Sequence, residues 1–234
     1  LYSLLNLATG ILGVAVLFGQ VKALHGWTFA STLALLGVYQ ILGALRGIVI
    51  GPSLDALAGM GGEIWTGRFD FTVMRPVNTQ FLASFSRWHL FSLIDLVLAL
   101  GVLVAAIAQL HEALSAWQIV AFLLTLCAGV GVLYAVLLIF AALIFWSPGF
   151  LFTWLFNSLF GMARYPIGLY PGWVRLLLTW VVPVGIMTTI PAQALSGDLS
   201  VVTLLGAILL ALLLVTGASL LFRVGLRRYA SASS

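Results

Sequence analysis

Long stretches without charge restrict the folds available to this chain more than any other feature of its sequence. Only 7% of the residues are Asp, Glu, Lys or Arg, whereas 63% are hydrophobic. Residues 116–145, for example, contain no charged side chain. Such a stretch exceeds the roughly 20 apolar residues that a helix needs to cross a bilayer core. A membrane β-barrel would instead show short segments of alternating polarity. The sequence therefore predicts an all-α protein that crosses a membrane several times.

Six apolar segments are long enough, or nearly long enough, to be transmembrane helices. They cover residues 1–19, 28–50, 88–110, 116–145, 150–162 and 199–222. Because the first residue is Leu rather than Met, we expect the natural chain to begin upstream of it. Residues 1–234 leave no room for a soluble domain beside these segments, so we expect a single transmembrane domain.

A further apolar piece, residues 176–190, differs from the six predicted spans. Pro183 divides it and Pro191 ends it, and each half is too short to cross a bilayer. We therefore expect residues 165–198 to form an external loop that contains a re-entrant or interfacial hairpin. The alternative is a seventh span, which would place the C-terminus on the opposite side of the membrane.

The distribution of basic residues predicts the orientation, because Lys and Arg are enriched on the cytoplasmic side of membrane proteins. If residues 51–87 and the C-terminal tail are cytoplasmic, seven of the ten basic residues lie on or near that side. These seven are Arg46, Arg68, Arg75, Arg87, Arg223, Arg227 and Arg228. The other three are Lys22, Arg164 and Arg175. We expect both termini to be cytoplasmic, and we attribute the net charge of +4 to this topology and to membrane lipid, not to nucleic acid.

The sequence offers no catalytic or metal-binding pattern. A P-loop needs Gly-x-x-x-x-Gly-Lys followed by Ser or Thr, and the only lysine, Lys22, does not stand in such a pattern. The single cysteine, Cys127, lies in an apolar run, and the histidines are scattered over different segments (His25, His89 and His111). We therefore expect no enzymatic activity, no metal and no cofactor in this chain.

Asp95 is the one acidic residue that falls inside a predicted span. A carboxylate at the centre of a bilayer costs about 2.5–3.5 kcal/mol on insertion scales. We therefore expect Asp95 to face protein or water, or to be protonated. Arg46, near the end of the preceding span, is the predicted structural partner. The alternative is a direct role of Asp95 in transport.

Three glycines recur every fourth residue near the end of the second predicted span. Gly43, Gly47 and Gly51 therefore share one helix face, and small residues on one face allow another helix to approach closely. This face predicts either packing within the chain or a contact with another subunit.

Residues 51–87 form the longest polar stretch between two predicted spans. Pro52 starts a helical turn or kinks the preceding helix, and Gly67 favours a helix stop. Phenylalanines then alternate with charged residues, and Arg75-Pro76 breaks any continuing helix. We expect a surface that docks a cytosolic partner; the alternative is a solvated loop with an interfacial helix. The apolar grip would comprise Phe69, Phe71 and Phe81, and the polar rim Glu63, Arg68, Asp70 and Arg75.

Two blocks in this region carry a family resemblance. They are Glu63-Ile-Trp-Thr-Gly-Arg-Phe-Asp-Phe and Met74-Arg-Pro-Val-Asn. Pro183, Pro191, the Leu195-Ser-Gly sequence and the tail Gly225-Leu-Arg-Arg-Tyr match the same pattern more loosely. The chain resembles, over nearly its whole length, the short six-span permease subunits of type-two ATP-binding-cassette exporters, once grouped as an uncharacterised bacterial family.

The resemblance implies a bacterial inner-membrane permease with six transmembrane helices, a cytoplasmic coupling-helix region in residues 51–87 and an external re-entrant hairpin before the last span. A second permease, identical or related, would complete the translocation path, and each would sit on one ATPase subunit that binds the ATP and magnesium. The implied coupling residues are Glu63, Arg68, Phe69, Asp70, Phe71, Arg75, Pro76 and Phe81. Pro183 and Pro191 would belong to the external gate.

Two other classes of protein are less compatible with this sequence. A secondary transporter or channel subunit usually carries more intramembrane charge, discontinuous helices or internal repeats. An intramembrane enzyme would need a buried cluster of His, Asp or Glu. The secondary transporter or channel is the alternative that we retain.

Overall fold

The computed structural model describes residues 2–20, 23–24, 26–59, 61–110, 114–147 and 152–229. Lys22, His25 and His111 lie outside these ranges, as does the start of the fifth predicted span at residues 150–151. All regular secondary structure within these ranges is helical, and the one β-bridge in them joins Leu24 to Trp27 in a turn. The predicted all-α class is therefore confirmed.

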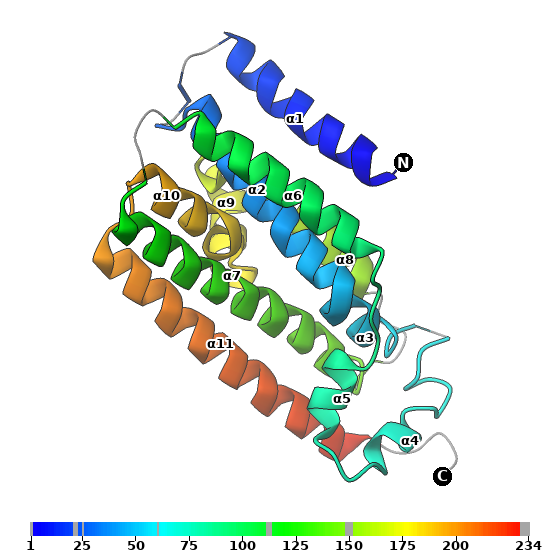
Figure 1. Ribbon diagram of the computed structural model, residues 1–234. Coiled ribbons are helices and arrows are strands. Elements are labelled where there is room, and N and C mark those ends of the chain that lie inside the picture. The colour runs from blue at the N-terminus through cyan, green and yellow to red at the C-terminus, as the bar shows by residue number, and fades with distance from the viewer. Residues whose placement is uncertain are drawn as a thin grey trace.

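Five long helices run along a common direction and form the bundle (Figure 1). They are α1 (Tyr2–Gln20), α2 (Phe29–Leu45), α6 (Ser92–Ala108), α7 (Ala116–Leu143) and α11 (Val201–Arg228). The π-helical turn η1 (Arg46–Ile50) and α3 (Gly51–Asp55) prolong α2. A helix end in a membrane protein needs a partner for its free N–H groups. Hydroxyl caps supply one at the starts of α2 (Thr28), α7 (Ser115) and α11 (Ser200).

The core of the bundle lies along α7 and α2. Leu133 and Leu137 on α7 and Leu36 and Leu42 on α2 are fully buried. α7 packs against α11, and α2 packs against α6. Gly37 permits the second contact, because a Cβ atom there would lie 3.1 Å from the Cα of Leu103 on α6.

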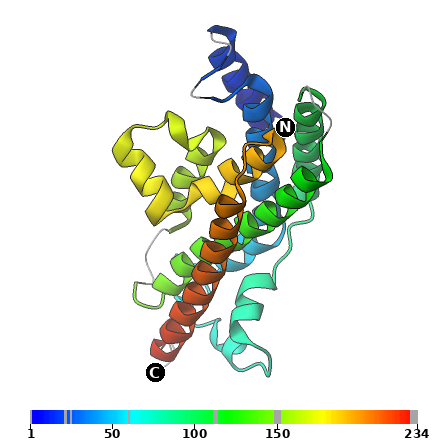
Figure 2. The same cartoon turned by 90° about the vertical axis from the view of Figure 1, so that its left-hand side faces the viewer.

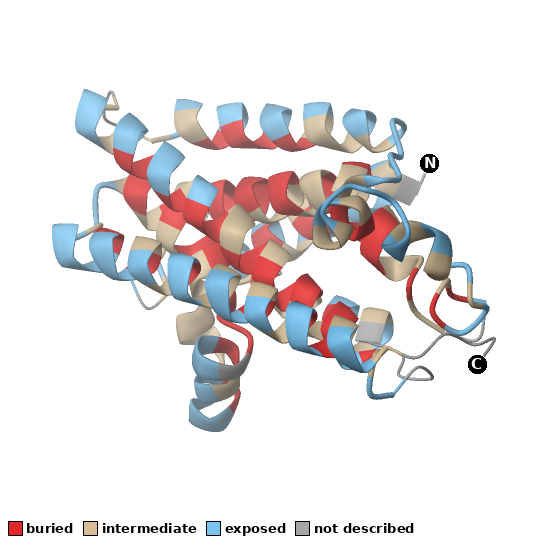
Figure 3. Cartoon of the chain, turned by 90° about the horizontal axis from the view of Figure 1, so that it is seen from below, coloured by how far each residue is buried: buried red, intermediate tan, exposed pale blue. Residues whose placement is uncertain are grey.

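Exposure differs strongly among the long helices (Figure 3). In the apolar window of α7, 56% of the residues are buried, compared with 22% in α11 and 11% in α1. The exposed side chains of α11 are mainly leucine and valine, such as Leu209 and Leu212. Apolar side chains on the outside of a helix bundle are the expected arrangement when lipid, not water, is the solvent.

Among the residues that the structure describes, four helices are long and apolar enough to cross a membrane: Ser3–Gln20, Phe29–Asp55, Ala116–Leu143 and Val201–Arg228. They correspond to the first, second, fourth and sixth predicted spans. The third predicted span, residues 88–110, contains α6, which is apolar but only 17 residues long. The count of six spans thus stays a prediction.

The fifth predicted span, residues 150–162, contains α8 (Phe152–Gly161). Its ten residues are about 15 Å long, or half the thickness of a bilayer core, so this span stays a prediction. A series of short elements follows and projects from one side of the bundle (Figure 2). They are η2 (Met162–Arg164), η3 (Ile167–Leu169), α9 (Gly172–Leu176), η4 (Leu177–Val181), η5 (Gly185–Thr189) and α10 (Ile190–Ser196).

A sharp bend divides these short elements near Pro183. The helical stretches Gly172–Trp180 and Gly185–Ser196 meet at 78°. α10 then packs against α7 and α2, at the end of the bundle where α11 begins (Figure 1). The break thus lies where the sequence predicts it. Since a bend of this size fits either a re-entrant hairpin or a broken span, the external hairpin stays a prediction.

The described ends of the chain lie at the same end of the bundle. The starts of α1 and α6, the last turn of α11, α4 (Asp70–Val73) and α5 (Thr79–Phe85) are all found there (Figure 1). This arrangement agrees with an even number of crossings. We call this end the coupling end.

Candidate coupling surface and polar cavity

The connection between α3 and α6 at the coupling end is joined to α2 through the backbone. Pro52 has no N–H to donate to the carbonyl oxygen of Ile48, four residues earlier. That oxygen accepts a hydrogen bond of 2.8 Å from the backbone N–H of His89, just before α6. Nearby, Ser53 Oγ accepts from the N–H of Arg87 at 3.0 Å and donates to the Arg87 carbonyl at 3.2 Å. The end of α2 and the entry to α6 are therefore bonded to each other.

The loop between α3 and α4 folds back on itself. Gly59 and Gly67 adopt φ angles of 79° and 72°, a region that side chains disfavour. Glu63 forms an ion pair with Arg87. Arg68 donates hydrogen bonds to Thr66 Oγ1 at 3.1 Å and to the carbonyl of Gly61 at 3.0 Å. Glu63 thus ties the loop to the segment before α6, and Arg68 stabilises the loop itself.

An aromatic cluster fastens this loop to the ends of α7 and α11. Phe69 is fully buried, and its ring centroid lies 5.7 Å from that of Phe145 and 5.3 Å from that of Tyr229. The Tyr229 hydroxyl donates a hydrogen bond of 2.8 Å to Asp70. Burial, this hydrogen bond and the negative charge of Asp70 raise the pKa of Tyr229 to about 12.

A polar cluster fastens α5 to the same two long helices. The Gln80 side-chain amide donates to the Tyr134 hydroxyl on α7 at 3.0 Å and to Ser219 Oγ on α11 at 2.9 Å. Ser84 shares a hydrogen bond of 3.0 Å with the same Tyr134 hydroxyl. The ring of Phe85 stacks on Tyr134 at 5.9 Å. Gln80 thus joins α5 to both α7 and α11, and three side chains of α5 contact Tyr134.

Beyond these attachments, the coupling end exposes large apolar side chains. Phe71 is 70% exposed, Met74 80% and Phe81 57%, and Arg75 and Pro76 beside them are also exposed. Exposed apolar groups at a polar helix end mark interaction sites more often than isolated surface residues do. We name Phe71, Met74, Arg75 and Phe81 the coupling surface.

The structure separates the predicted coupling residues into two groups. Phe71, Arg75, Pro76 and Phe81 are exposed. Phe69, which the sequence predicts to belong to the apolar grip, is instead fully buried, because the chain turns at Gly67 and directs its ring between two distant aromatic residues. Among the predicted rim residues, Glu63, Arg68 and Asp70 have partners within the chain. Met74 is a member that the sequence reasoning missed; its place between two phenylalanine-bearing segments was the available signal.

Arg46 pairs with a different carboxylate from the one predicted. Its guanidinium lies 3.5 Å from Asp55, bonds to Asn157 of α8 and lies 4.6 Å from the centre of the Phe156 ring. In a regular α-helix, residues nine apart lie on opposite faces. The wider turn of η1 rotates Asp55 toward Arg46. The predicted Arg46–Asp95 pair is therefore absent, because a nearer carboxylate on the same continuous helix takes its place.

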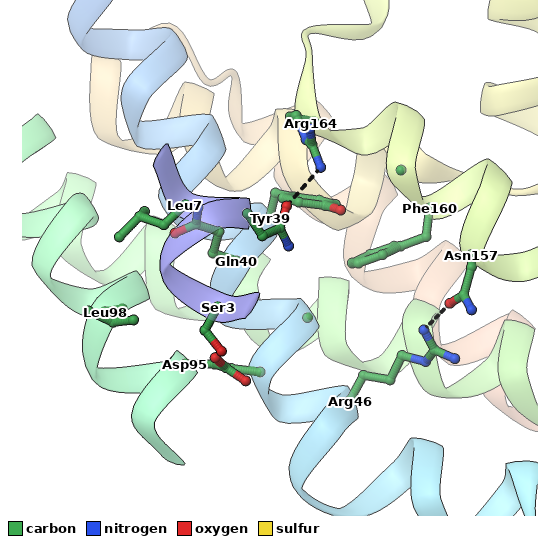
Figure 4. Close-up of a pocket in the computed structure, with 14 residues that line it drawn as sticks. Ser3, Leu7, Tyr39, Gln40, Arg46, Asp95, Leu98, Asn157, Phe160 and Arg164 are labelled. Carbon is green, nitrogen blue, oxygen red and sulfur yellow. Dashed lines mark hydrogen bonds between the residues drawn. The ribbon is translucent and has the colours of Figure 1, made fainter. Parts of the chain in front are cut away.

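Asp95 and Arg46 nevertheless line one cavity of about 500 Å³ between α1, α2, α6 and α8 (Figure 4). Arg46 points toward Asn157, away from Asp95 (Figure 4). Arg164 of η2 reaches the same cavity and donates a hydrogen bond of 3.1 Å to Asn6 of α1. Asp95 is half-buried. Within the described ranges it forms neither a hydrogen bond nor an ion pair through its side chain.

The three predicted packing glycines do not share one neighbour. A Cβ at Gly43 would lie 3.9 Å from Phe160 of α8, and one at Gly47 would lie 2.9 Å from Ser92 Oγ of α6. At Gly51 the nearest atom is the carbonyl oxygen of Arg46, at 3.0 Å. Only Gly47 therefore permits a close approach between long helices, and a subunit contact at this face stays a prediction.

The two predicted gate prolines lie on either side of η5. Pro183 follows the end of η4, and Pro191 lies in the first turn of α10. Pro191 has no N–H for the carbonyl oxygen of Met187. This oxygen faces Gly129 of α7, where a Cβ atom would lie only 2.8 Å away. The close packing of η5 on α7 thus depends on the absence of a side chain at Gly129.

No cluster of His, Cys, Asp or Glu in the described ranges is suited to hold a metal ion. A protein-family model described as "ABC-2 family transporter protein" matches residues 4–233. Neither the curated proteins nor the solved structures contain a match to the chain.

Proposed function

Because the chain belongs to the ABC-2 family of transporter proteins, and is thus the membrane permease of an ABC-type transporter, we propose that it exports its substrate through a path shared with a second permease. The family implies association with an ATP-binding subunit. We propose two such subunits, which bind the ATP and magnesium, and we assign no catalytic step to this chain. The membrane is the bacterial inner membrane, and the coupling end faces the cytoplasm.

The observation that carries the proposal is the attachment of the coupling surface to four long helices, namely α2, α6, α7 and α11. The backbone bond from His89 to Ile48 joins α6 to α2, and Gln80 joins α5 to α7 and α11. An ATPase that grips Phe71, Met74, Arg75 and Phe81 would therefore move several spans together. A flexible loop would dissipate the same movement.

The bend around Pro183 and Pro191 supports an external gate. Its last helix, α10, lies at the opposite end of the bundle from the coupling surface (Figure 1), and both η5 and α10 pack on α7 and α2. We propose that closure of the ATPase subunits moves α7 and opens this gate. A secondary transporter or channel subunit would not need a coupling surface.

Site-directed photo-crosslinking in intact cells tests this function. A photoreactive residue at position 71 or 81 should form an adduct with a protein that contains a P-loop. Position 173 is the matched control, since Trp173 is 74% exposed but lies outside the coupling end. Adducts with a P-loop protein from position 173 alone, or from none of these positions, would contradict the proposal.

The Phe71→Ala variant should leave the permease in the membrane but release the ATPase. Truncation of a hot-spot aromatic costs about 2 kcal/mol or more, which corresponds to a roughly 30-fold weaker complex. Trp173→Ala is the control and should bind as the wild type does. Affinity of the purified ATPase for permease in lipid nanodiscs measures both variants, and unchanged affinity in Phe71→Ala would exclude this anchor.

A further inference from the structure

The cavity between α1, α2, α6 and α8 contains more hydrogen-bond donors than the chain uses. Arg164 donates to the side-chain oxygen of Asn6, and Arg46 donates to the side-chain oxygen of Asn157. An arginine offers donors only, so each amide must turn its oxygen toward the guanidinium. The NH2 groups of Asn6 and Asn157 therefore remain as donors. The Nε atoms of both arginines are buried without a partner in the described part of the chain.

The charges that line this cavity are not balanced locally. Arg46 has Asp55 at 3.5 Å. No carboxylate of the described residues lies within 4 Å of Arg164, whose guanidinium instead lies 5.6 Å from the centre of the Tyr39 ring. Asp95, on α6, has no basic partner in the same ranges. An unpaired charge inside a membrane protein is costly and is retained where it serves a pathway or a ligand.

We propose that this cavity binds the headgroup of a zwitterionic amphiphile. Its anionic group, a phosphate or carboxylate, lies against Arg164 and the amides of Asn6 and Asn157. Its ammonium group lies toward Asp95. Such a ligand supplies the missing counter-charge to both residues at once. A purely anionic headgroup would compensate Arg164 but would leave Asp95 with repulsion.

The surroundings favour an amphiphile over a water-soluble zwitterion. The cavity of about 500 Å³ lies among helices with apolar exposed faces, and this volume is within the range of small-molecule sites. One wall is α1, in which only 11% of the apolar window is buried. A lipid headgroup can thus enter beside α1, which is weakly attached to the bundle, while the acyl chains of the lipid stay in the bilayer. The inference that the ligand is also the exported cargo rests on the proposed function, whereas the inference that it binds in this cavity does not.

Lipid retention by the purified full chain tests the site without an ATPase. Permease in nanodiscs is given equal amounts of a labelled phosphatidylethanolamine and a labelled phosphatidylglycerol with the same acyl chains. We expect the first lipid to be retained at least about tenfold better, because a charge-assisted hydrogen bond contributes about that factor. Equal retention, or a preference for phosphatidylglycerol, would overturn the proposal.

Variants test whether Arg164 binds the anionic group of the headgroup and whether Asp95 binds its ammonium group. Arg164→Gln should weaken retention of both lipids about tenfold, and Arg164→Lys should restore part of it. Asp95→Asn, which keeps the side-chain shape, should abolish the preference for phosphatidylethanolamine. Arg175→Gln is the matched control, since this exposed arginine bonds to the carbonyl of Gly168 and lies outside the cavity. A preference that survives both Arg164→Gln and Asp95→Asn would refute the site.

Soluble phosphoethanolamine distinguishes the source of the headgroup chemistry. It should displace the labelled lipid only at concentrations far above that of the lipid, because it lacks acyl chains. Displacement at equal concentration would show that the cavity takes a water-soluble zwitterion, which overturns the amphiphile. Loss of lipid binding with intact ATPase coupling would refute this site alone, whereas normal lipid binding without an ATPase partner would refute the proposed function alone.

Discussion

Two π-helical turns in this bundle are each followed by a proline but are held in different ways. Pro52 follows η1 at the coupling end, and Pro191 follows η5, toward the opposite end. At the first turn, the carbonyl oxygen of Ile48 accepts a hydrogen bond from His89. At the second turn, the carbonyl of Met187 receives no hydrogen bond from another helix in the described ranges and only packs against Gly129.

The difference teaches which of the two π-helical turns is suited to move. A turn that is bonded to a second span moves together with it, since separation would leave an unpaired carbonyl at membrane depth. A turn that is held by packing alone can shift without breaking a hydrogen bond between helices. This contrast agrees with a rigid coupling end and with the proposed external gate at Pro183 and Pro191.

The largest expected effect is at the packed turn η5. Gly129→Val should destabilise the permease by about 2–3 kcal/mol, because its Cβ would overlap the Met187 carbonyl and overpacking costs about that much. Gly131→Ala is the matched control on the same helix, since a Cβ there meets its nearest neighbour, Val215, at an ordinary 3.7 Å. Thermal unfolding in one detergent measures both variants. Equal stability of the two variants would show that η5 is not held by this contact.

The bonded turn η1 should respond to a smaller change. Ser53→Ala removes the hydroxyl that bonds to the N–H and carbonyl of Arg87, at a cost of about 1 kcal/mol. Ser86→Ala, at an exposed position, serves as the control and should have no effect. The same unfolding assay applies, together with the ATPase activity of the assembled transporter. If Ser53→Ala lowers neither the stability nor the ATPase activity, the contrast between η1 and η5 loses its basis.

The smallest expected effect concerns the tail. The pKa of Tyr229 is raised to about 12 by burial and by Asp70, against an ordinary value near 10. The folded state therefore binds this proton more tightly than the unfolded state does. The resulting stability is fully present below about pH 10 and is lost as the pH rises through 12.

Ultraviolet difference titration at alkaline pH checks this prediction. The spectrum of Tyr229→Phe is subtracted from that of the wild type, and the phenolate signal should appear about two pH units above that of a free tyrosine. Asp70→Asn should lower this pKa, since it removes a negative charge beside the phenol. A titration of Tyr229 near pH 10 would show that the tail is not attached to the loop in solution.

Much of the fold follows from the sequence because the signals are local. Apolar stretches predict the long helices, and Pro183 predicts the break before α10. The length of α8 was not predictable, because the apolar composition of residues 150–162 fits a span and a buried short helix equally well.

The candidate site was only partly predictable, because much of it depends on contacts that the local sequence does not reveal. The polar composition of residues 51–87 predicts that this segment lies at the surface, but it does not predict which of its phenylalanines are exposed. The burial of Phe69 depends on Phe145 and Tyr229, which are far away in the chain. The pairing of Arg46 with Asp55 depends on the π-helical turn, for which the residues Arg46–Ile50 show no local signal.

The hydrogen bond between Ile48 and His89 also determines how far the other end of α6 moves when its first turn tilts. α6 begins next to this bond and extends 17 residues from it, or about 25 Å at 1.5 Å per residue. With the bond as a fulcrum, each degree of tilt at the coupling end displaces the far end of α6 by roughly 0.4 Å. A small rotation imposed by an ATPase would therefore become a lateral stroke at the opposite membrane face. The stroke is amplified by helix length alone and needs no change of fold.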